Sequence, residues 1–165
     1  MPSKRSAAPR SPSTSPTFPS DWHEFLSLLT SHHVKFVVVG AHAFAIHGRP
    51  RMTEDLDVFI EASTSNATRL RQALVEFGFG AAAPETAILA EPKRVFMLGA
   101  KPYRIDLLTF ISGVSFAAAW RARVMVETSA GPVPFISKRL LIKNKRAAGR
   151  PKDLLDIEAL LTKRR

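Results

Sequence analysis

Hydrophobic residues recur at helical spacing in some parts of this chain and gather in short runs in others. Over residues 22–29 they fall at i, i+3, i+4 and i+7, which predicts a helix, and Ser20 or Asp21 can cap its beginning. A similar stripe over residues 70–77 predicts another long helix. Further helices are expected over 40–47, 114–121, 137–147 and 152–162.

Runs of β-branched and aromatic residues predict the strands. They cover residues 35–39, 57–61, 94–98, 103–108, 123–127 and 133–136. Strands mixed with helices, between and after them, indicate an α/β (α+β) domain in which helices pack on a small mixed β-sheet.

Composition limits the domain count and the chemistry. The 165 residues suffice for one domain with a sizeable core, and no apolar run approaches the ~18 residues of a membrane span. The chain has no cysteine, which excludes disulfides and thiolate metal ligands, and nothing marks it for secretion, so we expect a cytoplasmic protein without a membrane partner.

The charge is strongly unbalanced, at +10 overall. Residues 1–20 carry three of these positive charges and are rich in Ser, Pro and Ala, so we expect a disordered basic tail there and a folded domain over 21–165. The remaining +7 suits an anionic partner such as nucleic acid, or else it is a solvated surface without a partner.

Residues 38–60 are the most informative stretch. A hydrophobic strand ends at Gly40, and Asp55 and Asp57 open the next strand. Because strand side chains alternate between faces, the two carboxylates point the same way. Like charges on one face disfavour burial, whereas Mg²⁺ prefers oxygen ligands and takes one or two carboxylates plus substrate phosphates.

Asp106 supplies a third carboxylate, inside the apolar strand predicted over 103–108, where a lone charge is costly. If this strand lies beside the strand of Asp55 and Asp57, the three carboxylates could hold two Mg²⁺ ions about 3.5–4 Å apart for phosphoryl transfer. The structural alternative for Asp106 is an ion pair with Arg104. The adjacent glycine turn favours the metal interpretation.

Other polar residues nearby have two interpretations each. Asp55 could cap a turn, and Asp57 could pair with Arg49 or Arg51. Those two arginines could instead clamp phosphate, since guanidinium is a bidentate donor. For His47, a bond to the backbone is favoured over contact with a nucleotide.

Together these residues resemble the nucleotidyltransferase superfamily that includes DNA polymerase β. Its signature is a hydrophobic residue, Gly and then Gly or Ser, followed after a spacer by Asp-hydrophobic-Asp/Glu-hydrophobic. Here Val39-Gly40-Ala41 is followed by thirteen residues and then Asp55-Leu56-Asp57-Val58. The string from His47 to Asp55 is similar to the small bacterial branch of minimal nucleotidyltransferases and AbiEii-like toxin or antitoxin proteins. The resemblance covers about residues 35–162.

The resemblance implies a nucleotidyltransferase fold and the transfer of a nucleoside monophosphate from an NTP to an acceptor hydroxyl. The implied catalytic and metal-binding residues are Asp55, Asp57 and Asp106. The implied nucleotide-binding residues are Gly40, Ala41, Arg49, Arg51, Lys145, Arg150 and Asp153. In the C-terminal segment, Lys145 and Arg150 would lie near the triphosphate or an RNA backbone and be fixed by Asp153 and Asp156, and a solvated helix surface is the alternative.

Ala41 departs from the family pattern, because it lacks the hydroxyl that serine would offer to phosphate. Backbone N–H groups at the next helix N-terminus can still hold phosphate. The acceptor stays open: RNA such as a tRNA 3′ end is favoured, a partner protein modified as by AMPylating antitoxins is the second candidate, and a non-catalytic nucleotide- or RNA-binding module is the third. A cognate toxin or antitoxin protein is an expected partner.

Overall fold

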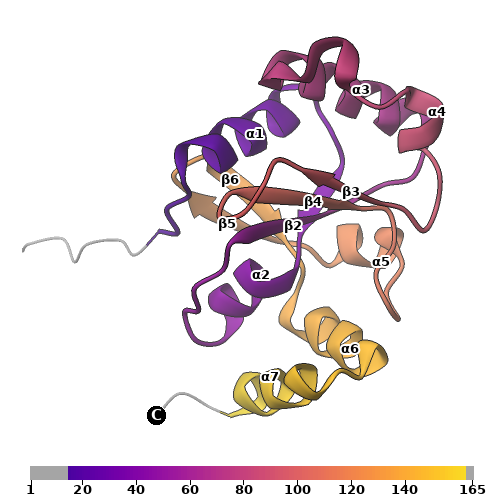
Figure 1. Cartoon of the computed structure of the whole chain (residues 1–165). Coiled ribbons are helices and arrows are strands. Elements are labelled where there is room, and N and C mark those ends of the chain that lie inside the picture. Colours follow the sequence, from indigo (N-terminus) through magenta and orange to yellow (C-terminus); the bar gives the residue numbers. More distant parts are fainter. Residues whose placement is uncertain (1–14, 163–165) are drawn as a thin grey trace, which may run out of the picture.

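A computed structural model describes residues 15–162, which fold around one six-stranded sheet (Figure 1). The strand order is β3-β4-β2-β1-β6-β5. The strands are β1 (Phe36–Val38), β2 (Asp55–Ile60), β3 (Val95–Leu98), β4 (Arg104–Leu108), β5 (Val124–Thr128) and β6 (Gly131–Phe135). β2 pairs with β4, and β1 with β6, in parallel, while the other neighbours are antiparallel. This mixed sheet with its packed helices confirms the predicted fold class.

Helices cover both faces of the sheet. In Figure 1, α1 (Ser20–Ser31), α3 (Thr64–Leu74) and the short α4 (Thr86–Leu89) lie above it. Below it lie α2 (Gly40–His47), α6 (Lys138–Ala148) and α7 (Pro151–Leu161), and α5 (Phe116–Arg121) packs beside β1. The lower layer matters for the site because α2 packs against β2, the strand that carries the paired aspartates, and α6 packs against α2.

The local sequence explains where these helices begin and end. The predicted stripe of α1 is buried, with Phe25, Leu26 and Leu29 wholly so. The Ser137 hydroxyl accepts a hydrogen bond from the Leu140 N–H at the start of α6, as a capping serine does. The helix predicted over 70–77 covers the second half of α3 and the beginning of the π-helical turn over Val75–Phe79, whereas α4 was not predicted.

The chain packs onto the fold from Pro16 onward. The N–H of Phe18 donates to Ser129 Oγ at 3.1 Å, and the Ser129 N–H donates to the Pro16 carbonyl at 3.1 Å. Phe18 is buried in the core. Most of the expected tail, residues 1–14, lies outside the described residues, and the packed region begins before residue 21. No helix within residues 15–162 is long and apolar enough to cross a membrane.

Candidate active site

The pairing of β2 with β4 brings three carboxylates to one face of the sheet. Asp57 is in register with Asp106, and Asp55 with Arg104. Paired residues share a face, and so do residues two apart on one strand. The expected neighbour relation of the two strands is therefore confirmed, and β2 begins at Asp55 because the parallel pairing extends back to that residue.

Arg104 lies between two of these acids. Its Nη2 is 3.2 Å from Asp55 Oδ2 and 2.9 Å from Asp106 Oδ2, and its Nε is 2.8 Å from Asp106 Oδ1. The hydrogen bond to Asp106 raises the pKa of Arg104. On the other side, the Thr53 hydroxyl donates to Asp55 Oδ1 at 2.8 Å. The ion pair foreseen as the structural alternative for Asp106 is thus present.

Asp57 is the acid without a cation. No side chain within residues 15–162 forms a hydrogen bond or ion pair with its carboxylate, and neither of the two arginines considered for it reaches it: Arg51 pairs with Asp156 at 2.9 Å, while Arg49 is exposed. Burial, followed by the charges of Asp55 and Asp106, raises the pKa of Asp57 to about 6. The site therefore holds excess negative charge, centred on Asp57.

Gly40 brings the backbone against that carboxylate. It is the first residue of α2 and has φ +66°, and a Cβ added there would lie 2.1 Å from Asp57 Oδ2. Only glycine permits both the conformation and the approach. The N-terminus of α2, with Ala41 as its second residue, therefore opens directly beside the acids. His47, at the other end of the helix, contacts the Ile136 carbonyl through Nε2 at 2.7 Å, which is the backbone-bound role favoured for it.

A cavity of about 420 Å³ joins Asp57 to the C-terminal helices. Its lining residues are Val39, Gly40, Asp57, Leu108, Ile111, Ser112, Asn144, Ala148 and Arg150. The walls are polar and apolar in about equal parts, one end carries the carboxylate of Asp57, and Arg150 supplies a cation.

Of the C-terminal residues predicted to bind nucleotide, Arg150 lines the cavity, whereas Lys145 and Asp153 are buried away from it. Lys145 is 5% exposed, and its Nζ lies 2.6 Å from Asp156 Oδ2 and 3.6 Å from Asp153 Oδ1. Burial alone would raise the pKa of Asp153, but hydrogen bonds from Arg150 bring that pKa below its ordinary value. The predicted pairing of these acids with Lys145 and Arg150 is confirmed, but of the four only Arg150 lines the cavity.

Comparison with known proteins decides the family. The family model described as the nucleotidyl transferase AbiEii toxin of type IV toxin–antitoxin systems matches residues 24–145. This chain belongs to the AbiEii family. A crystal structure of an antigenic nucleotidyltransferase-like protein from Paracoccidioides brasiliensis has the same fold, with a TM-score of 0.51 and 14% sequence identity over 88% of this chain and 78% of that chain. A search of the curated proteins found no match.

In this AbiEii-family chain, the carboxylates of Asp55, Asp57 and Asp106 are ligands of the kind that Mg²⁺ prefers, but they are not arranged around one point. Within the part of the chain that the structure describes, no three His, Cys, Asp or Glu side chains are arranged to hold a metal ion. The guanidinium of Arg104 accounts for this, because it takes up the carboxylates of Asp55 and Asp106. Three hard oxygen donors on one face, one of them without a cation, are nevertheless the chemistry that a divalent cation requires.

Sequence reasoning missed two residues of this site. Asn144 and Ser112 line the cavity, and the Asn144 amide donates to the Ser112 carbonyl at 2.9 Å. A signal was available, because Leu140, Asn144 and Ala148 are spaced at i, i+4 and i+8 and so share one face of α6.

Proposed function

We propose that this AbiEii-family protein transfers a nucleoside monophosphate from an NTP to an acceptor hydroxyl. The acceptor oxygen attacks the α-phosphorus, the bond from that phosphorus to the bridging oxygen of the β-phosphate breaks, and pyrophosphate leaves with that oxygen. The observation that carries the proposal is the contact of Gly40 with the cation-free Asp57, in register with Asp106.

Asp55, Asp57 and Asp106 would hold Mg²⁺. When bound, Mg²⁺ would polarise the attacking hydroxyl and neutralise charge on the leaving pyrophosphate. Arg104 has to leave the carboxylates of Asp55 and Asp106 before those oxygens are free to bind a cation. We assign removal of the acceptor proton to Asp106, as the acid in register with Asp57.

The nucleotide would lie along α2 and the adjoining cavity. The N-terminus of α2, at Gly40 and Ala41, lies beside Asp57, and the backbone N–H groups of a helix N-terminus suit phosphate oxygens. The cavity of about 420 Å³ suits the nucleoside, since its walls combine apolar side chains with the polar Ser112 and Asn144, and Arg150 suits the phosphates. Lys145 and Asp153 would act indirectly, by fixing α6 and α7.

The acceptor would approach from the other side of Asp55. A second hollow of about 480 Å³ lies there, lined by Met52, Thr53, Glu54, Asp55 and Lys101. Nucleotide and acceptor would then reach the acids from two separate openings, which is compatible with attacking and leaving oxygens on opposite sides of the phosphorus.

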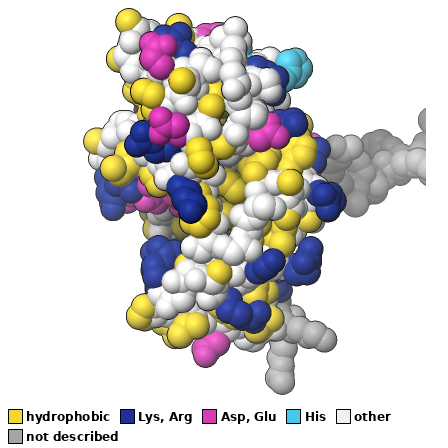
Figure 2. Space-filling model, turned by 90° about the vertical axis from the view of Figure 1, so that its right-hand side faces the viewer, with side chains coloured by type: hydrophobic (Ala, Val, Ile, Leu, Met, Phe, Trp, Pro, Cys, Tyr) yellow, Lys and Arg dark blue, Asp and Glu magenta, His cyan; other side chains and the backbone are white. Residues whose placement is uncertain are grey.

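RNA, such as a tRNA 3′ end, is the acceptor that the charge favours. Residues 21–165 carry +7, and Figure 2 shows Lys and Arg side chains outnumbering acids over the lower half of one face. The type IV toxin–antitoxin family also implies a cognate antitoxin as a partner.

The test is nucleotide transfer from α-labelled NTPs, with total tRNA and cell protein offered as acceptors, in Mg²⁺ and in EDTA. Label should pass to RNA only with Mg²⁺, and Asp57→Asn should slow the transfer by about 10³-fold or more, because a charge-stabilising group is lost. Glu158→Gln, an exposed acid on α7, is the matched control and should leave the rate unchanged.

Two results would overturn parts of this proposal separately. Transfer that survives Asp57→Asn would remove the metal role of the site. Labelled protein instead of labelled RNA would replace the acceptor but keep the chemistry. An RNA acceptor further predicts binding that weakens steeply with salt, because phosphate contacts release counterions.

A further inference from the structure

Two prolines open a slot in the middle of the sheet. β6 is an interior strand, yet it contains Pro132 and Pro134, and proline has no N–H to donate to a β-ladder. β1 and β6 are in register at Val38 and Phe135 alone, where the Ile136 N–H donates to the Val38 carbonyl at 3.0 Å. Two residues earlier on β6, Pro134 stands where the next donor of a parallel ladder would be, so the strands part there.

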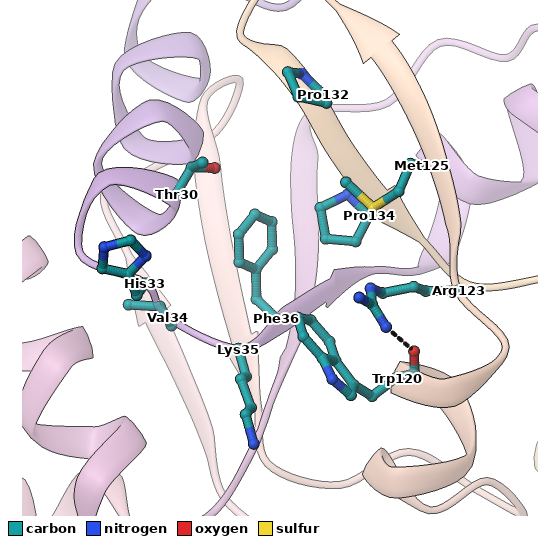
Figure 3. A pocket seen from close by; sticks show the side chains of 10 residues that line it. All are labelled: Thr30, His33, Val34, Lys35, Phe36, Trp120, Arg123, Met125, Pro132 and Pro134. Carbon is teal, nitrogen blue, oxygen red and sulfur yellow. Dashed lines mark hydrogen bonds between the residues drawn. The ribbon is translucent and has the colours of Figure 1, made fainter.

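A pocket of about 330 Å³ fills this gap, at the end of β1 opposite Gly40 (Figure 3). Its apolar lining is formed by Val34, Phe36, Trp120, Met125, Pro132 and Pro134. In Figure 3 the rings of Phe36 and Pro134 lie on either side of the opening, and no residue of the acid site contributes. Among residues 15–162, no acidic side chain lines the pocket.

Arg123 lies at the rim of the pocket without a carboxylate partner. Its Nη1 donates to the Trp120 carbonyl at 2.6 Å, and the guanidinium carbon lies 3.8 Å from the centre of the Trp120 ring. Within residues 15–162 it forms no ion pair, so its other N–H donors are free. Lys35 differs, because its amine lies 3.3 Å from Glu61, and Figure 3 shows it pointing away from the pocket.

The guanidinium is also held rigidly. Trp120 stacks on Phe116 with ring centres 6.0 Å apart and planes 20° apart, so one face of the indole is supported by Phe116 and Arg123 lies over the ring. A fixed cation with free donors, next to an apolar pocket without acids, suits a ligand that has an apolar body and one negative group.

We propose that this pocket binds a small organic anion, namely a single ring or short acyl group that carries a carboxylate. The apolar body would enter between Phe36 and Pro134, and the carboxylate would accept hydrogen bonds from Arg123. A volume near the lower end of ligand pockets restricts the ligand to about one ring. The site is separate from the acid site and does not depend on the proposed function.

Tryptophan fluorescence tests this proposal on the full chain. The chain has two tryptophans, and the other, Trp22, is 2% exposed in the core, so a ligand-dependent change reports on Trp120. Phenylacetate and hexanoate are the probes for an aromatic and an acyl body. At least one should cause a saturable change, and its neutral amide should bind about tenfold more weakly, because a charge-assisted hydrogen bond is lost.

Two pairs of variants assign the binding to this pocket. Arg123→Gln should weaken the better probe about tenfold, while Arg121→Gln, at an exposed arginine of the same region, should not. Met125→Glu places an acid at the rim on a side chain that is 53% exposed and should block binding, whereas Met125→Gln should not. The proposal is overturned if neither probe saturates by about 10 mM, a range that covers weak ligands, if the amides bind equally well, or if Arg123→Gln and Met125→Glu leave binding unchanged.

Discussion

Two charged clusters, both built from aspartates and basic residues, lie on the same side of the sheet and are balanced in opposite ways. The acid site consists of Asp55, Asp57, Asp106 and Arg104, so that three carboxylates share one cation. The C-terminal cluster consists of Arg51, Lys145, Arg150, Asp153 and Asp156, so that two carboxylates share three cations. The carboxylates of the C-terminal cluster are all paired with cations, which fits a cluster that holds helices together. The acid site has fewer cations than carboxylates, which fits a site that binds an added cation.

The largest loss of stability is expected when Lys145, the central cation of the C-terminal cluster, is removed. Lys145→Met keeps the side-chain length but leaves Asp156 with Arg51 alone and Asp153 with Arg150 alone. Loss of the buried cation should lower the free energy of unfolding by about 3 kcal/mol, the lower end of the range for a broken buried pair, because each acid keeps one arginine. Urea denaturation measures the loss. Lys143→Met, on an exposed position of the same helix, should change it by no more than about 0.5 kcal/mol. Equal effects from both variants would mean that the cluster is not structural.

The second-largest loss of stability is expected at the close contact between Gly40 and Asp57. Gly40→Ala strains a backbone with φ +66° and forces a Cβ to within 2.1 Å of Asp57 Oδ2, whereas Gly131→Ala strains a similar φ of +84° with no atom within 4 Å. Backbone strain costs about 1–3 kcal/mol at each position, so Gly40→Ala should cost more than Gly131→Ala in the same unfolding experiment. Adding Asp57→Ala should recover the difference, and a difference of zero between the two glycine variants would contradict the contact.

Another effect appears in the pH dependence of stability. The folded-state pKa of Asp57 is about 6 against an ordinary value of 3.8, so the folded protein binds this proton more tightly than the unfolded chain. Its stabilising contribution is therefore complete below about pH 4 and lost as the pH rises through about 6.

Asp57→Asn replaces the ionisable carboxyl by a neutral amide, so the variant should not lose this stability as the pH rises. The variant should be more stable than the parent by about 3 kcal/mol at pH 8, and the advantage should shrink towards pH 4. Thermal or urea unfolding across that range checks the prediction, with Glu24→Gln as a control at an exposed acid. A constant difference at every pH would show that Asp57 ionises normally in the fold.

The smallest effect tests Arg104 as the internal counter-ion. Arg104→Gln frees the carboxylates of Asp55 and Asp106, so Mg²⁺ should bind several-fold more tightly and raise the melting temperature more than in the parent. Arg121→Gln is the matched control, because it removes an exposed arginine on α5 that lines neither the cavity nor the hollow beside the acids. Unchanged Mg²⁺ affinity, measured by calorimetry, would show that Arg104 does not compete with a cation.

The sequence predicted correctly those features of the fold that depend on residues close together in the chain. The helix over 40–47 follows from the small residues between two hydrophobic strands, and the structure has it over the same residues. The adjacency of Asp57 and Asp106 was predicted only on the condition that their strands pair, because no periodicity in one segment encodes its neighbour. Metal binding and the nucleotide-binding roles stay predictions.

The remaining differences come from long-range packing. Lys145 has the sequence context of a solvated helix, and its burial depends on α7 folding back so that Asp156 reaches it. The packing of Phe18 depends on Ser129, which lies 111 residues away, so composition alone could not show that this segment is held. The slot beside Pro134 likewise exists only because β6 lies between two other strands.

The register of β2 and β4 has a consequence for synthesis. Asp57 and Asp106 meet only after the intervening helices and β3 have been made and β4 has paired, so a nascent chain that has not yet reached β4 has no acid site. Any chemistry of these acids therefore has to wait until residue 106 has been made and β4 has paired with β2.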